Sequence, residues 1–147
     1  MSRSTALLND HLQHLGEQLV VVRLYRETTD KPYVKTALTF VEDDTQEAIA
    51  KTASRLRQLG QQPTGHLFNK ALMAQVKRSH RDRILVEKLQ FVWRSLKQQL
   101  DWYLTHAKTF RDDADSQAML VALAEQTRVR LERWENLMDE MKVSPGG

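Results

Sequence analysis

The sequence contains no cysteine and no long apolar run. Without cysteine, the chain cannot form disulfides, thiolate metal sites or a thiol nucleophile. Apolar runs such as LVVV, residues 19–22, are far shorter than the roughly 18 residues that a membrane-spanning helix needs. The first residues also lack the apolar stretch of a secretory signal. We therefore expect a cytoplasmic protein that does not associate with membranes.

Chain breakers are scarce as well, with 5 glycines and 3 prolines and none of either within residues 66–144. The alternating β-branched runs typical of strands are absent. Apolar residues instead recur three and four positions apart, along one face of a helix at about 100° per residue. We predict an all-α protein with helices over about 4–27, 31–59, 81–110 and 116–141. Asp30 is expected to cap the second helix, and Asp115 or Ser116 the fourth.

The connections between these helices predict the topology. Those after the first and third helices are short, which makes each pair an antiparallel hairpin. The connection at residues 61–80 is long and includes a short helical pattern, HLFNKALMAQVK. We therefore predict a four-helix bundle with one long central crossover. It would form a single domain over residues 1–147, with a frayed tail at about 143–147.

The two predicted hairpins look like copies of each other. Adding 81 to positions in the first helix, and 82 to positions in the second, places apolar residues on apolar residues in the other hairpin. The matched pairs include Leu8 with Leu89, Leu15 with Leu96, Leu38 with Leu120, and Thr45 with Thr127. A near-constant offset over both helices indicates an internal repeat.

Two segments resemble a known superfamily. LNDHLQHLGEQLVVVRLY, residues 8–25, resembles the first helix of a bacterioferritin, and LTFVEDDTQEA, residues 38–48, resembles the second-helix pattern of a rubrerythrin. Both belong to the ferritin-like superfamily of four-helix bundles. The resemblance implies a di-metal site inside the bundle. In that site, Glu from two helices and Glu-x-x-His from the other two hold two Fe or Mn ions.

This sequence departs from the family's ligand pattern on every helix. The first Glu position falls at Leu15, or at Gln18 if Tyr25 sets the register. The remaining ligand positions hold Thr45, Ala48, Leu96, Thr127 and Arg130. We therefore expect no di-metal site, no cofactor and no catalytic residue. The two threonines are expected to return their hydroxyls to backbone carbonyls one turn back.

The nearest acidic alternatives in a shifted register are Asp44 with Glu47 and Glu125 with Arg128. A separate metal-site candidate is His11 with His14, beside Asp10. On a helical wheel, Glu47 points to solvent and Glu125 lies on the far side of its helix. Two histidines three positions apart can share a metal, but without a convergent carboxylate such a pair is more often part of a polar flank.

The middle of the chain is basic, although the formal net charge is only +3. One interpretation is a docking surface for nucleic acid or for an acidic partner protein. The other is a solvated face that acids such as Asp112, Asp113 and Asp115 offset in the fold. The candidate anion-binding residues are Lys70, Lys77, Arg78, Arg81 and Arg83.

The first helix carries a second apolar patch, Val20, Val21 and Leu24, roughly opposite its core stripe. A helix that is apolar on both sides is usually covered on both sides. Either a second subunit covers this patch, which makes the three residues dimer contacts, or the crossover does. The crossover residues suited to this role are Leu67, Phe68, Leu72 and Met73.

These patterns favour a non-enzymatic interaction or assembly module that self-associates. One alternative is a ferritin-like di-iron protein that acts in iron oxidation, iron storage or peroxide detoxification. Another is a nucleic-acid-associated helical protein that uses the basic segment.

Overall fold

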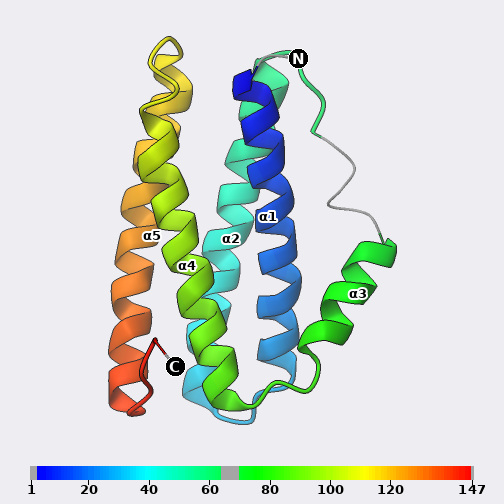
Figure 1. Ribbon diagram of the computed structural model, residues 1–147, viewed down its shortest axis with the longest axis vertical. Helices are drawn as coiled ribbons and strands as arrows, with labels where there is room; N and C mark the ends of the chain where they lie inside the picture. The colour runs from blue at the N-terminus through cyan, green and yellow to red at the C-terminus, as the bar shows by residue number, and fades with distance from the viewer. Residues whose placement is uncertain (1–2, 64–69, 147) are drawn as a thin grey trace. The chain divides into compact units, whose positions relative to one another are not determined.

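The computed structural model describes residues 3–63 and 70–146, and the regular structure within these ranges is helical throughout. Its helices are α1 (Arg3–Glu27), α2 (Pro32–Gln58), α3 (Lys70–His80), α4 (Leu85–Ala107) and α5 (Ala114–Glu140) (Figure 1). The prediction of an all-α protein is confirmed. The four long helices overlap the predicted ranges, although α4 is shorter than the predicted 81–110 at both ends. Helix α3 is the short helix expected within the crossover.

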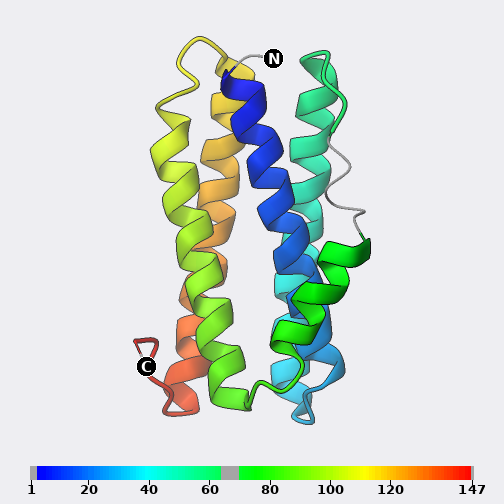
Figure 2. The same ribbon diagram turned by 45° about the vertical axis from the view of Figure 1, so that its right-hand side comes forward.

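The chain divides into two compact units, Met1–Asp82 and Arg83–Gly147. In the first unit α1 packs against α2, and α3 packs against α1 (Figure 2). In the second unit α4 packs against α5. Each predicted hairpin is therefore present within its own unit.

The buried face of α1 is wider than its predicted stripe. Leu8, Leu12, Leu15 and Val22 are buried as expected, whereas Leu19 is only half-buried. Further side chains of α1 are buried on the same helix, including Gln18, Val21 and Tyr25. Because α3 packs against α1, the helix is covered on more than the side that faces α2.

The internal repeat is visible in the helix ends. Helices α2 and α5 each contain 27 residues, and their bounds differ by 82 positions at both ends. Each helix is followed by a residue with positive φ, Gly60 at 79° and Lys142 at 58°. The next amide then donates to a carbonyl five residues back, as in a Schellman motif. These bonds join Gln61 N to Leu56 O and Val143 N to Met138 O, both at 2.9 Å.

The predicted N-caps are wrong by one to three residues. The N-cap of α2 is Lys31, which makes no side-chain cap, because the helix begins at Pro32 and leaves Asp30 one position too early. The N-cap of α5 is Asp113, whose carboxylate accepts from the Ser116 backbone N–H at 3.1 Å. Ser116 and Asp115 lie inside the first turn, where they cannot occupy the capping position.

The C-terminal tail differs from the frayed segment expected over 143–147. The Schellman bond holds Val143, and the Gln90 side chain on α4 donates to the Ser144 carbonyl at 2.9 Å. The first residues beyond α5 are therefore attached to their own unit.

The two Schellman ends predict opposite effects of substitution. A Cβ at Gly60 meets no heavy atom within 4 Å, so Gly60→Ala should cost only backbone strain, about 1 kcal/mol of unfolding free energy. Lys142→Gly should raise that free energy by up to about 1 kcal/mol, because it relieves the strain of a lysine at positive φ. Urea unfolding measures both, with Gly146→Ala as the control. Equal losses in Gly60→Ala and Gly146→Ala would contradict this interpretation.

Candidate functional site

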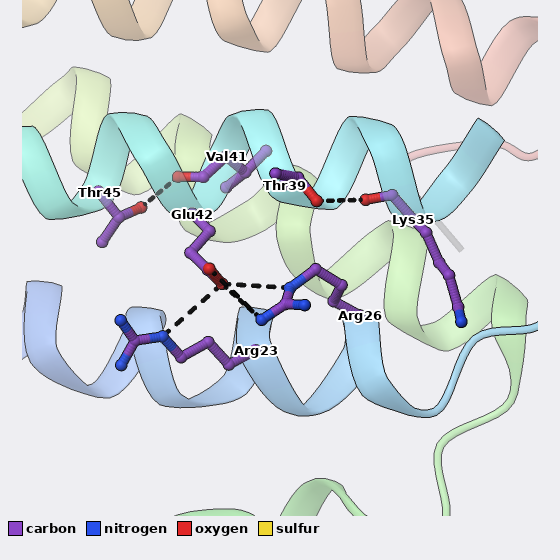
Figure 3. A network of polar contacts seen from close by, with 7 residues as sticks. All are labelled: Arg23, Arg26, Lys35, Thr39, Val41, Glu42 and Thr45. Carbon is purple, nitrogen blue, oxygen red and sulfur yellow. Dashed lines mark hydrogen bonds and ion pairs between the residues drawn. The ribbon is translucent and has the colours of Figure 1, made fainter. Parts of the chain in front are cut away.

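A layer of polar side chains lies between α1 and α2. Gln18 and Thr45 are both buried, and Gln18 Nε2 donates to Thr45 Oγ1 at 2.8 Å. The Thr45 hydroxyl in turn donates to the Val41 carbonyl at 2.7 Å, one turn back along α2 (Figure 3). The Thr45 hydroxyl thus donates one hydrogen bond and accepts another. Buried polar groups are stable when their hydrogen bonds are made in this way.

The second hairpin repeats the threonine contact. Thr127 is buried and donates to the Leu123 carbonyl at 2.7 Å. The expectation that both threonines bond to carbonyls one turn back is confirmed. Gln99, which the repeat matches with Gln18, donates instead to the Tyr103 hydroxyl at 3.1 Å. Burial raises the pKa of Tyr103, and the bond from Gln99 acts in the opposite direction.

Leu15 and Gln18, the two residues considered for the first ligand position, have different surroundings. Leu15 is buried among the core side chains of α1, whereas Gln18 is the α1 residue bonded to Thr45. Of the other positions, Ala48 and Leu96 are buried and Arg130 is half-buried.

Polar residues recur at heptad spacing along this hairpin. His11, Gln18 and Tyr25 are seven residues apart on α1 and all are buried, as are Thr45 and Thr52 on α2. In an antiparallel helix pair, a contact recurs one heptad further along each helix in opposite directions. His11 and Thr52 therefore occupy the level next to that of Gln18 and Thr45. Within the described residues, the buried Thr52 hydroxyl has no hydrogen-bond partner.

Of the acids that offered shifted ligand sets, Asp44 is half-buried, whereas Glu47 and Glu125 are exposed. Glu47 is exposed and accepts from Lys51 Nζ at 2.9 Å. Glu125 is also exposed and pairs with Arg128 at 2.6 Å. The hydrogen bond from Arg128 lowers the pKa of Glu125. The carboxylates of Glu47 and Glu125 point to solvent, as the helical wheel predicts.

The two histidines of α1 have different surroundings. His11 is buried, whereas His14 is exposed, so the pair does not share one environment. Among residues 3–63 and 70–146, no group of three or more His, Asp or Glu side chains is placed to hold a metal ion.

Glu42, an acid of the segment at residues 38–48, makes a contact that was not predicted from the sequence. The Glu42 side chain is only 12% exposed and lies between Arg23 at 3.6 Å and Arg26 at 3.2 Å (Figure 3). Glu42 thus joins α2 to α1 instead of facing solvent. The signal in the sequence is the pair of arginines three residues apart, which share one face of α1.

The second apolar patch of α1 is partly covered in the folded chain. Val21 is 2% exposed, while Val20 and Leu24 are half-buried. Val21 therefore has little surface left to offer a second subunit. Helix α3, which belongs to the crossover, packs against α1, as the interpretation of cover by the crossover expects.

A specific contact joins α3 to α1. The Tyr25 hydroxyl lies 2.7 Å from His80 Nδ1, and their rings meet edge-on with centroids 5.8 Å apart. Leu72 and Met73, suggested as cover for the patch, are half-buried, and the other two suggested residues, Leu67 and Phe68, lie outside the described residues. No local pattern in the sequence predicts the Tyr25–His80 contact, because the two residues are 55 positions apart.

The candidate anion-binding residues fall into two groups. Lys70, Lys77 and Arg78 lie on α3 and Arg81 follows it, all exposed. Arg83 belongs to the second unit and pairs with Glu87 at 3.4 Å.

The acids suggested as offsetting charges do not neutralise Arg83. Asp112, Asp113 and Asp115 lie around the start of α5, beyond the far end of α4 from Arg83. At 1.5 Å per residue, the length of α4 separates these acids from Arg83 by about 30 Å. This distance is well beyond the Debye length at physiological salt, so their attraction to Arg83 is screened.

No family model, curated protein or solved structure matches this chain. No helix in the described part of the chain is both long and apolar enough to cross a bilayer. The function must therefore be inferred from the chain's own residues.

The polar layer predicts unequal effects of two matched substitutions. Thr45→Val removes the acceptor of a buried amide donor, so it should lower the unfolding free energy by about 1–3 kcal/mol. Thr127→Val removes only a bond to the helix's own carbonyl and should cost less than about 1 kcal/mol. Denaturant unfolding of both variants measures the difference. Gln18→Leu combined with Thr45→Val should recover part of the loss, and a fully additive double variant would contradict a direct contact.

Proposed function

We propose that this chain is a non-enzymatic interaction or assembly module, built as a ferritin-like four-helix bundle without the family's di-metal site. The observation that carries the proposal is the Gln18–Thr45 layer. An amide and a hydroxyl pair with each other there, at positions where the resemblance implies metal-binding carboxylates.

The chemistry of this layer supports a metal-free interior. Carboxylates gathered in a core need a metal, because without one they repel each other and are costly to desolvate. Gln18 has the length of a glutamate but no charge, and it presents an N–H donor to Thr45. The Thr45 proton is already committed to the Val41 carbonyl. The layer is therefore complete without an ion.

The internal repeat supports closure of the two hairpins into one bundle. Repeated helical units seldom bury their apolar faces alone, and stacked copies cover one another. Helices α2 and α5 match in length, in end motif and in their buried threonines. Two equivalent hairpins joined by a long connection are what a ferritin-like topology requires.

An exposed aromatic stripe supports the proposed interaction role. Tyr33 and Phe40 are 52% and 49% exposed, and their seven-residue spacing places them on one face of α2. Large apolar side chains grouped on a surface are typical of protein–protein contacts. We propose that this face, rather than Val21, mediates contact with a second copy of the chain.

Metal content tests the proposal directly. Protein purified after growth with added iron should contain well below one equivalent of Fe or Mn per chain, measured by mass spectrometry of the digested protein. It should not accelerate oxidation of ferrous iron by oxygen. About two equivalents per chain, retained in His11→Ala/His14→Ala, would overturn the proposal and favour the di-iron alternative.

Solution scattering tests the bundle and the dimer together. In the monomeric variant Tyr33→Ser/Phe40→Ser, a closed single-chain bundle should have a radius of gyration of about 15 Å, and two separated hairpins a clearly larger one. Light scattering over a concentration series should show a dimer mass. Tyr33→Ser/Phe40→Ser should convert that dimer to monomer, while the matched variant Val20→Ser/Leu24→Ser should not. A monomer at every concentration would remove self-association from the proposal.

A further inference from the structure

Helix α3 has two unlike faces. Its apolar residues Leu72, Met73 and Val76 are half-buried, whereas Lys70, Lys77 and Arg78 are exposed. Lys70 and Lys77 are seven residues apart and therefore lie on the same face, about 10 Å apart along the axis. Arg81, one residue beyond the helix, continues the same line and is exposed. We call Lys70, Lys77, Arg78 and Arg81 the α3 basic face.

In the part of the chain that the structure describes, the α3 basic face has no acidic partners. Within the described residues, none of its four side chains makes an ion pair or a side-chain hydrogen bond, whereas Lys51, Lys97 and Arg128 each pair with a carboxylate. The sequence explains the difference, because residues 48–81 contain seven Lys or Arg and no acid at all. An acid-free run of this kind leaves its positive charge available to an anionic partner.

The face is held in place by its own unit. Helix α3 packs against α1, and the Tyr25 hydroxyl meets His80 Nδ1 at 2.7 Å at the C-terminal end of α3. Tyr25 is fully buried, so this contact anchors the end of α3 that carries Lys77, Arg78 and Arg81. The cations are thus displayed from an ordered helix.

The residues beside the cations indicate which anion they suit. A membrane-surface helix needs a free apolar face to enter the lipid, but the apolar residues of α3 are half-buried. A protein interface is organised around buried aromatic or large apolar anchors. The exposed remainder of α3 offers Ala71, Ala74, Gln75 and Ser79 instead. A row of positive side chains without apolar anchors suits the phosphate backbone of a nucleic acid better than a protein interface.

We propose that the α3 basic face binds the phosphate backbone of duplex nucleic acid without sequence preference. Helix α3 shows no exposed aromatic side chain on which unpaired bases could stack, which favours duplex over single strands. Its 11 residues span about 16 Å, roughly half a turn of the duplex. Four cations on this length give about four phosphate contacts. This role is independent of the proposed metal-free bundle, since it needs only the first unit.

The salt dependence of binding tests this role. Anisotropy of a fluorescent 20-base-pair duplex of mixed sequence, titrated with the full chain between 25 and 200 mM salt, should give a log–log slope of about −3 to −4. Replacing all four residues of the α3 basic face by Gln should weaken binding at least tenfold and bring the slope close to zero. A second duplex of unrelated sequence should bind equally well.

Matched variants separate this surface from net charge alone. Lys35→Gln/Lys108→Gln/Arg111→Gln/Arg133→Gln removes the same four charges from exposed positions elsewhere and should leave most of the affinity. Equal losses in the two quadruple variants, or no duplex binding at the lowest salt, would overturn the proposal. So would tighter binding to a single strand of equal length, to polyglutamate or to vesicles rich in phosphatidylserine. Circular dichroism confirms that both variants stay helical.

Discussion

The interior of the first unit depends on one constraint, that a buried polar group must have its hydrogen bonds made locally. Thr45 meets this constraint within its own helix by donating to the Val41 carbonyl, and it remains an acceptor for the Gln18 amide. Thr127 satisfies the same constraint on α5. The two hairpins therefore place polar side chains at equivalent buried positions without any charge. The α1–α2 seam is further joined at its edge by Glu42 between two arginines.

Much of the helical architecture could be predicted because helix periodicity is a local property. The stripe of α2 recurs at the expected spacing, and the threonine hydroxyls bond as anticipated because their acceptors lie one turn away in the same helix. The helix starts were less predictable. An N-cap depends on the backbone angles of one residue, and Asp30 and Asp113 are equally good capping types in the sequence.

The contacts that the sequence did not reveal are those between distant positions. Gln18 bonds to Thr45 on the neighbouring helix, 27 positions further along the chain. Tyr25 and His80 meet because α3 returns along α1, and no local pattern indicates that return. Val21 has little exposed surface in the folded chain, although its apolar patch looks like an interface in the sequence.

The direction of the hydroxyl proton at Thr45 limits which side chains position 18 can accept. Because that proton points to the Val41 carbonyl, the threonine turns a lone pair toward position 18. A glutamate there would place two electron-rich oxygens against each other in a dry interior, which an ionised carboxylate tolerates poorly. An ionised carboxylate therefore cannot enter this layer by one substitution without a loss of stability.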